Sequence, residues 1–289
     1  MSDSQNAVLP PSNNDFRVRI KKLTRNPIVV GGAIMFVVML LLAIFAPLLS
    51  SHDPRYINPL ERLKPPSAEH LLGTDHLGRD QWSRILFGAR LSISVGLVTT
   101  LTVTLLGILV GLAAGYFKRL DNVIMRIMDG MMAFPGTLLA IAFIAALGPS
   151  AQNVVLALTI VYLPNMARIV RGQMLSLREV TYVEAADAFG AKTSRIMFRH
   201  MLPNMFGPIN VQATFIFAYA ILAEASLSFL GVGVSPEVPS WGNMLSTGKT
   251  YMSQAPWLLI PGGAIMFTTL ALTLVGDGLR DIFDPRGTD

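Results

Sequence analysis

Long apolar stretches that contain no charged residue are the feature that most constrains this sequence. Residues 28–49 and 91–117 are two such stretches, and neither contains Asp, Glu, Lys or Arg. At a rise of ~1.5 Å per residue, an α-helix of either length can cross a hydrocarbon core of ~30 Å. Charged residues make up 14% of the chain, whereas soluble proteins average about 25%. We therefore expect an all-α, polytopic helical membrane protein.

Six transmembrane helices are expected, over residues 28–49, 91–117, 127–147, 154–170, 206–230 and 257–275, and the third is expected to be interrupted at Pro135-Gly136. Residues 81–90 are expected to lie along the membrane interface before the second span. Basic residues gather beside the spans, a pattern that places the flanking segments inside. They are Arg17, Arg19, Lys21, Lys22, Arg25, Lys118, Arg119, Arg126, Arg168, Arg171, Arg280 and Arg286. Both termini and the segment after the fourth span are therefore expected inside, although the outer residues 50–90 also carry basic side chains.

Composition and spacing exclude several kinds of site. The chain has no cysteine, which rules out disulfides and thiolate metal sites. The net charge of +5 arises mostly beside the spans, which argues against a nucleic-acid partner. Residues 242–250, GNMLSTGKT, approach a phosphate-binding loop, but five residues separate the glycines where that loop requires four. We expect no cofactor, no ATP site and no catalytic residue in this chain.

The longest polar interruption in the second half of the chain, residues 182–204, reads YVEAADAFGAKTSRIMFRHMLPN. A short helix is expected over 180–189, and Gly190 stands where a helix end favours a residue with positive φ. Thr193 and Ser194 are expected to cap a second helix. Pro203 is expected to mark a break before the next span. A short helix with small residues between membrane spans is typical of a docking element.

This segment resembles the EAA loop of ABC-importer permeases. The family pattern is EAA, three residues, Gly, nine residues, Ile, any residue and Leu-Pro. Here the pattern falls on Glu184, Ala185, Ala186, Gly190, Leu202 and Pro203, with His200 in place of the usual Ile. Residues 72–80, LGTDHLGRD, and 276–285, GDGLRDIFDP, resemble the C-type permease subunit of dipeptide, oligopeptide and nickel importers. The likeness covers nearly the whole chain.

The resemblance implies the type-1 ABC-importer permease fold, with the permease domain over residues 85–278. The remaining parts would be a cytoplasmic tail (1–27), an anchor span with an extracytoplasmic loop (28–84) and a second cytoplasmic tail (279–289). It also implies a transport subunit of the bacterial cytoplasmic membrane that has no nucleotide site of its own.

The resemblance further implies four kinds of partner: a homologous second permease, two ATP-binding subunits, an extracytoplasmic substrate-binding protein and membrane lipid. The EAA residues would couple this chain to the ATP-binding subunits. The substrate would be a di- or oligopeptide, with nickel complexes and glutathione as open alternatives. A secondary transporter is the rival class, but such proteins often show internal repeats and broken helices with buried charges. No internal repeat is evident in this sequence.

Two sets of charged residues have two interpretations each. Glu224, inside the fifth span, is expected to face either the transport cavity or a hydrogen-bond partner on another helix. Arg126 and Asp129 are three residues apart and share a helix face. They form either a structural pair or a gate contact near the inner end of the third span.

Glycines and histidines supply the remaining candidates. Small residues spaced along the second span favour close helix packing over a substrate path; they are Gly96, Gly107, Gly111 and Gly115. A metal site is conceivable near Asp75, but the histidines around it match no standard ligand spacing. These histidines, His52, His70 and His76, are expected to be ordinary loop residues, so no metal site is predicted.

Overall fold

The structure, a computed structural model, describes residues 26–283 of the chain. Helices dominate this part, and its only β pairing is an isolated bridge between Thr74 and Asp80. Two segments that the charge pattern predicts to be inside, the basic cluster at 17–25 and the end of the tail at 284–289, lie outside the described residues.

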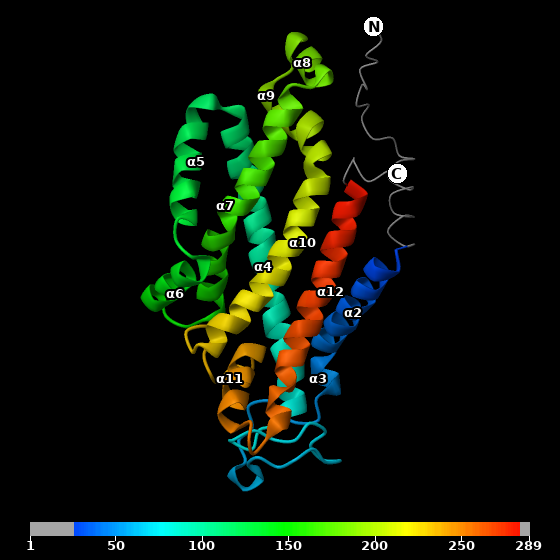
Figure 1. Cartoon of the computed structure of the whole chain (residues 1–289), viewed down its shortest axis with the longest axis vertical. Coiled ribbons are helices and arrows are strands. Elements are labelled where there is room, and N and C mark those ends of the chain that lie inside the picture. The colour runs from blue at the N-terminus through cyan, green and yellow to red at the C-terminus, as the bar shows by residue number, and fades with distance from the viewer. Residues whose placement is uncertain (1–25, 284–289) are drawn as a thin grey trace.

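Five helices within residues 26–283 are long and apolar enough to cross a membrane. They are α2 (Pro27–Ile44), α4 (Gln81–Tyr116), α7 (Ala151–Arg178), α10 (Leu202–Phe229) and α12 (Ile260–Phe283). They form an elongated bundle (Figure 1), in which α4 packs most extensively against α7. Contacts of α10 with α12 and α4, and of α12 with α2, complete the bundle. The prediction of an all-α polytopic membrane protein is confirmed.

The third predicted span, residues 127–147, is interrupted at Pro135, as the sequence indicates. The chain forms α5 (Lys118–Met132) and α6 (Gly136–Leu147), with a bend of 90° between them. The break ends at Pro135, which has no N–H to donate and disfavours helical geometry in the residue before it. The prediction also missed the start of α5 at Lys118. The first turns of α5 are amphipathic and carry charged residues on one face, so they fall outside the apolar stretch. A sixth span exists in the described residues only if the bent pair crosses the membrane as one unit.

The second span also begins earlier than the apolar stretch indicates. Asp80 caps α4, and its Oδ2 accepts a hydrogen bond from the Ser83 N–H at 2.8 Å. Residues 81–90, predicted to lie along the interface, are therefore the first turns of the same helix. With 36 residues, α4 is longer than a hydrocarbon core of ~30 Å requires at ~1.5 Å per residue. The helix is therefore long enough for its first turns to extend beyond the hydrocarbon core, toward the preceding loop.

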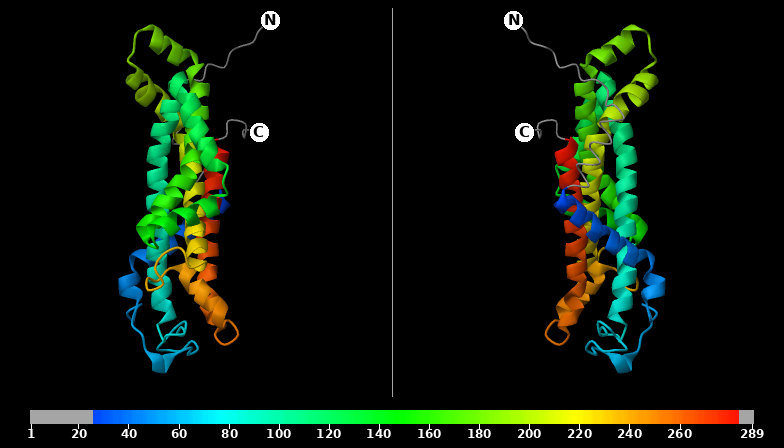
Figure 2. Two further views of the ribbon diagram at one scale, coloured as in Figure 1. Left: turned by 90° about the vertical axis from the view of Figure 1, so that its left-hand side faces the viewer. Right: turned by 90° about the vertical axis from the view of Figure 1, so that its right-hand side faces the viewer.

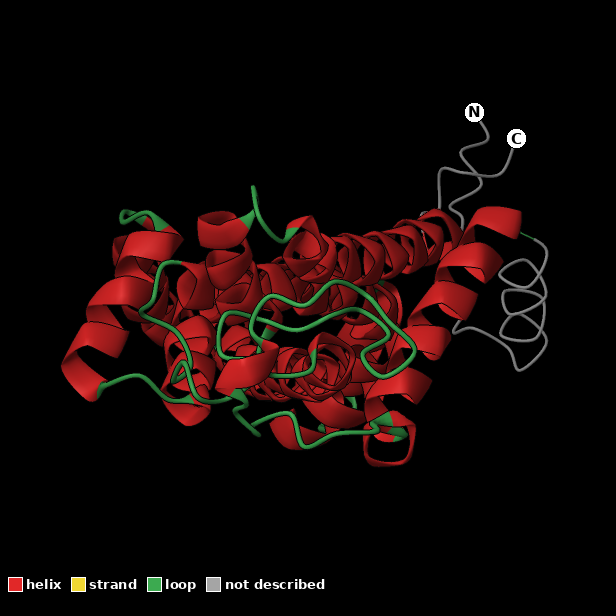
Figure 3. Ribbon diagram, turned by 90° about the horizontal axis from the view of Figure 1, so that it is seen from below, coloured by secondary structure: helices red, strands yellow, loops and turns green. Residues whose placement is uncertain are grey.

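Short elements occupy the two ends of the bundle. One end holds α8 (Thr181–Ala188), α9 (Thr193–Arg195) and the π-helical η2 (Ile196–Met201). The other end holds α3 (Ala46–Leu49), η1 (Pro59–Glu61), α11 (Trp241–Tyr251) and η3 (Pro256–Leu259). Figure 2 shows α8 and α9 standing clear of the bundle, and Figure 3 looks onto the opposite end, where loops cross the helix ends. We call these the α8 end and the loop end.

Glycines on α4 allow neighbouring helices to approach closely. A Cβ added at Gly111 would lie 2.6 Å from the Cβ of Val170 on α7, closer than real carbon contacts allow. Gly107 and Gly115 are similarly close to α7, and Gly96 is similarly close to α10. The packing interpretation of these glycines is confirmed.

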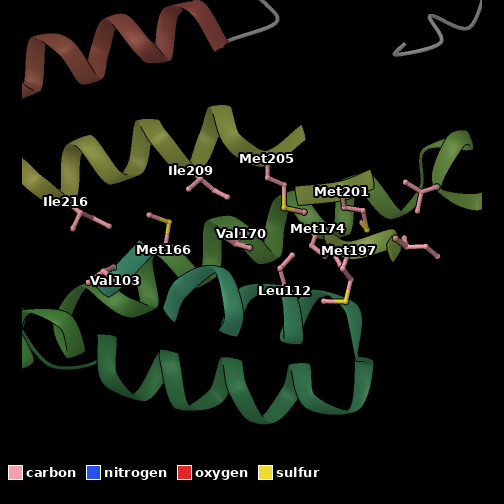
Figure 4. Packing of buried hydrophobic residues seen from close by; sticks show 12 residues of the cluster. Val103, Leu112, Met166, Val170, Met174, Met197, Met201, Met205, Ile209 and Ile216 are labelled. Carbon is pink, nitrogen blue, oxygen red and sulfur yellow. The ribbon is translucent and has the colours of Figure 1, made fainter. Parts of the chain in front are cut away.

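A methionine-rich core lies between the long helices and the α8 end (Figure 4). Methionine is unbranched and flexible, so it fills irregular gaps where helices of different direction meet. Val183 of α8 belongs to the same cluster as residues of α4, α7, η2 and α10. The buried methionines of this core are Met166, Met174, Met197, Met201 and Met205.

Candidate functional site

The predicted short helix at the α8 end is present and turns where the sequence indicates. α8 covers Thr181–Ala188, one residue shorter at each end than predicted. Gly190 has a φ of 74°, and the N–H of Ala191 returns to the Ala186 carbonyl oxygen at 3.0 Å. Positive φ is costly for residues with a Cβ, which explains glycine at this position. Glu184 and Ala185 are exposed on the helix, and Ala186 is half-buried.

The second helix of the segment starts differently from the prediction. Lys192 occupies the N-cap position, and no side chain caps the helix. The Thr193 hydroxyl instead accepts a hydrogen bond from the Tyr116 hydroxyl at the end of α4, at 3.2 Å. Thr193 therefore ties the segment to α4 and does not cap its own helix.

Pro203 does not break the chain either. The π-helical turn η2 precedes it, and the Leu202 N–H donates to the Met197 carbonyl oxygen, five residues back. Pro203 then lies in the first turn of α10, where a missing N–H is tolerated. The helical path consequently runs without interruption from Thr193 to Phe229.

Tyr182 anchors α8 to the start of α10. Its hydroxyl accepts a hydrogen bond from Asn204 Nδ2 at 2.9 Å and donates to the His200 carbonyl oxygen at 3.3 Å. Burial raises the pKa of Tyr182, which keeps the phenol protonated and able to donate. Asn204 Nδ2 also donates to the His200 carbonyl oxygen at 2.8 Å. These contacts use the main chain of His200, so they tolerate its side chain in place of the usual Ile.

Arg178 joins the end of α7 to the end of α4. Its Nη1 donates to the carbonyl oxygens of Gly115 and Tyr116 at 3.4 and 3.3 Å. Its guanidinium also lies over the Tyr116 ring, 5.6 Å from the centroid. A cation at the last carbonyls of a helix is favourable for the helix dipole. Arg178 therefore fixes the base from which α8 projects.

An open groove of about 1120 Å³ runs between α8 and η2. Phe189 borders it and is 92% exposed, and Phe198 is also exposed. Exposed basic side chains line the same groove: Lys192, Arg195 and Arg199. Sequence reasoning missed Phe189, because an apolar residue at the end of a helix gives no sign of whether it is packed or exposed. An aromatic tip beside a basic rim can insert into an apolar pocket with an acidic border.

Glu224 is completely buried and links two helices. Its Oε2 accepts a hydrogen bond from the Ser92 hydroxyl of α4 at 2.7 Å. Its Oε1 accepts one from Ser228, one turn further along α10, at 2.9 Å. Glu224 does not line the open cavities at the loop end, at the α8 end or between α7, α10 and α12. We interpret Glu224 as an inter-helix hydrogen-bonding group.

Substitutions at Glu224 test this interpretation. We expect Glu224→Gln to fold normally, because an amide can accept from one serine and donate to the other. Glu224→Leu removes both acceptors and should cost about 2 kcal/mol. The measurement is the thermal unfolding midpoint in detergent, with substrate uptake as a second readout. A Gln variant that folds normally but loses uptake would favour a cavity-facing anion.

The expected pair of Arg126 with Asp129 is not formed. Asp129 Oδ1 instead accepts from Arg168 Nη2 of α7 at 2.7 Å, and both side chains are largely exposed. Arg126 is exposed on α5. A second, bidentate pair holds α5 on α7: Arg171 donates to both oxygens of Asp121 at 2.5 and 2.6 Å. Sequence spacing within α5 could not reveal partners on α7.

At the loop end, the motif at 72–80 forms a closed turn. Asp75 Oδ1 accepts from the N–H groups of Leu77 and Arg79, and Asp75 Oδ2 accepts from Arg79 Nε at 2.7 Å. Arg84 Nε lies 3.7 Å from the same carboxylate. Gly78 adopts a φ of 75°, where a Cβ would collide with Asn58. Arg79 and Arg84, the latter in the first turn of α4, therefore share one buried carboxylate.

Residues 242–250, whose sequence approaches a phosphate-binding loop, form most of α11 (Trp241–Tyr251). Ser240 caps this helix, and the buried Trp241 donates from Nε1 to the Ile85 carbonyl oxygen at 3.1 Å. A Cβ added at Gly242 would collide with the Ala225 carbonyl oxygen. Gly242 therefore serves helix packing, not a phosphate-binding loop.

The fold defines a polytopic α-helical membrane protein that carries a short, largely exposed helix, α8, at one end. A sequence family described as "Binding-protein-dependent transport system inner membrane component" matches residues 104–288. A second, "N-terminal TM domain of oligopeptide transport permease C", matches residues 16–66. The chain belongs to the family of inner-membrane components of binding-protein-dependent transport systems.

Relatives align over most of the chain. A putative peptide transport system permease protein of Brucella suis is 47% identical over 256 residues, which cover 88% of this chain and 86% of the relative. The dipeptide transport system permease protein of Alkalihalophilus pseudofirmus is 46% identical over 286 residues, 98% of this chain and 92% of the relative. The oligopeptide transport system permease protein of Bacillus subtilis is 42% identical over 263 residues, 90% of this chain and 86% of the relative.

Proposed function

We propose that this chain is a permease subunit of an ATP-driven importer that carries di- or oligopeptides across the bacterial cytoplasmic membrane. The observation that carries the proposal is the near full-length similarity, at 42–47% identity, to permeases named for peptides, dipeptides and oligopeptides. A homologous permease subunit forms the other half of the path. The chain has no nucleotide site of its own, and two partner subunits bind and hydrolyse ATP.

The α8 end faces the cytoplasm in this proposal, and the loop end faces the binding protein. Exposed basic side chains at the α8 end support this orientation: Lys192, Arg195 and Arg199. At the loop end, Arg79 and Arg84 are instead buried beside Asp75, where they hold the turn that precedes α4.

Docking of the ATP-binding subunits uses α8 and its groove. Phe189 and Ala185 supply an exposed apolar and small-residue surface, and Glu184 supplies a carboxylate for hydrogen bonds from the partner. Motion of α8 reaches the long helices through Val183 in the methionine-rich core and through the hydrogen bonds of Tyr182. Leu202 and Pro203 lie where this segment passes into α10.

The translocation path follows a polar surface between α7, α10 and α12. An open cleft of about 800 Å³ runs between these helices. Its lining includes Gln173, Gln212, Thr273, Asp277 and Arg280. Polar side chains on membrane-spanning helices normally face protein or water. We therefore assign this surface to the path shared with the second permease.

An uptake experiment tests the function. Cells without their own peptide permeases, supplied with the complete complex, should accumulate radiolabelled dialanine and a labelled tetrapeptide. Inactivation of the ATP-binding subunits should abolish this uptake. Labelled nickel and glutathione serve as comparison substrates. Uptake of either comparison substrate without peptide uptake would contradict the peptide assignment, and uptake without ATP hydrolysis would contradict the importer class.

A further inference from the structure

Three potential metal ligands that are far apart in sequence meet at the loop end. His52 follows α3, His70 lies in the following loop, and Asp80 caps α4. His70 Nδ1 is 2.9 Å from Asp80 Oδ1, and His52 Nδ1 is 4.0 Å from the same oxygen. One ligand atom from each residue lies within 4.8 Å of the others. Tetrahedral coordination at ~2.0–2.2 Å separates ligand atoms by about 3.4 Å, so small side-chain movements would complete the site.

Neighbouring groups already orient two of the three ligands. Asp80 Oδ2 accepts from the N–H and the hydroxyl of Ser83 at 2.8 and 2.7 Å, which leaves Oδ1 directed at the histidines. His70 Nε2 lies 3.4 Å from Glu61 Oε2. A carboxylate on the far nitrogen of a ligating histidine fixes its tautomer and ring orientation. Lys64 Nζ donates to Glu61 Oε1 at 3.0 Å, which holds this carboxylate in place.

His52 supplies the observation that points to a ligand. Its Nδ1 is buried, yet it makes no hydrogen bond within the described residues. A buried nitrogen without a partner is costly, and this one faces the Asp80 carboxylate. The His52 side chain is 32% exposed, whereas those of His70 and Asp80 are 4% and 3% exposed. His52 also lines an open crevice of about 690 Å³, through which an ion and water can enter.

We propose that His52 Nδ1, His70 Nδ1 and Asp80 Oδ1 bind a divalent transition-metal cation of the zinc class. Two imidazole nitrogens and a carboxylate oxygen suit zinc, cobalt or nickel, and water from the crevice supplies the fourth ligand. The cation occupies His70 Nδ1, and any proton on this nitrogen is released to water. The bound imidazole is neutral with its proton on Nε2, where it donates to Glu61 Oε2.

The site would join both ends of the loop that precedes α4. His52 comes immediately after the first span and α3, and Asp80 starts the second span. A bound cation would therefore fix the surface that this loop presents at the loop end, and unfolding the loop would require loss of the cation. This role is separate from the cleft between α7, α10 and α12.

Metal binding can be measured on the purified full-length chain in its complex, with a histidine-free affinity tag and after treatment with a chelator. The absence of cysteine removes thiolate binding by this chain. We expect one equivalent of Co²⁺ with a visible absorption band typical of tetrahedral coordination, displaced by Zn²⁺. Zn²⁺ should also raise the thermal midpoint. His52→Ala and His70→Ala should each weaken binding at least tenfold.

His76→Ala is the matched control, because His76 lies in the same loop but stacks on Tyr251, with ring centroids 5.3 Å apart. It should bind Co²⁺ as the unchanged protein does. If His70→Ala does not fold, His52→Ala decides, because His52 Nδ1 has no hydrogen bond to lose among the described residues. Absence of Co²⁺ and Zn²⁺ binding, or unchanged binding by His52→Ala, would overturn the proposal.

Discussion

Gly190→Val is expected to release the ATP-binding subunits while the permease stays folded in the membrane. Valine at a φ of 74° is strained, and no atom lies within 4 Å of the added Cβ, so the strain acts on the backbone of this turn alone. A left-handed conformation costs roughly 1–2 kcal/mol for a residue with a Cβ. That cost corresponds to a ~5–30-fold shift in an equilibrium. Copurification of the ATP-binding subunits and substrate-stimulated ATP hydrolysis measure the loss.

Gly231→Val is the matched control for this substitution. Gly231 also has a positive φ, 82°, and open space around its Cβ position, but it follows the far end of α10. It should impose a similar backbone strain without affecting the ATP-binding subunits. Equal losses in both variants would show that the effect is general destabilisation and not loss of the α8 surface.

Glu184→Lys examines the same surface through charge. Glu184 is exposed on α8, so the substitution leaves the packing of Val183 and Tyr182 intact. A helix that merely lay on anionic lipid would tolerate the added positive charge. We expect the variant to insert normally and to lose ATP-binding subunits on purification, while Glu184→Gln retains more of them.

Gly111→Val is expected to abolish the folded bundle. The added Cβ would lie 2.6 Å from Val170 Cβ and 2.7 Å from the Ala167 carbonyl oxygen, so α4 and α7 would have to separate. Forced overpacking in a well-packed interface costs about 3 kcal/mol, and here main-chain atoms block relaxation. We expect little monodisperse protein in detergent and a strongly lowered thermal midpoint.

Gly130→Val provides the comparison for this effect. Gly130 is also helical and lies on α5, and no atom lies within 4 Å of the position that an added Cβ would take. This variant should match the unchanged protein in yield and thermal midpoint. Comparable loss in both variants would contradict the close packing of α4 on α7.

The sequence predicts what is local and periodic. Uncharged apolar stretches indicate the long helices, and Gly190 marks the turn after α8 because glycine tolerates that φ without strain. Pro135-Gly136 marks the interruption of the third predicted span. The apolar stretch does not reveal the 90° bend there, nor the charged first turns of α5. Pro203 suggests a break that does not occur. The π-helical turn η2 precedes it, so the helix continues although Pro203 has no N–H to donate.

The rest depends on contacts between residues that are distant in the chain. Tyr182 of α8 contacts Asn204 of α10 only because η2 returns the chain toward α8. Asp129 of α5 pairs with Arg168 of α7. The spacing of His52 and His70 matches no metal-binding motif, because the third residue of the cluster, Asp80, stands at the start of α4. Such partners follow from packing and cannot be read from spacing along one segment.

The most direct test of α8 as the docking helix is site-specific cross-linking. The chain lacks cysteine, so Ala185→Cys can carry a thiol-linked photoreactive group without background labelling. Leu60→Cys, at a position that is 90% exposed at the loop end, is the matched control. We predict that the group at 185 cross-links to an ATP-binding subunit and that the group at 60 does not. Cross-linking of 185 to lipid alone while peptide uptake persists would contradict the docking role of α8.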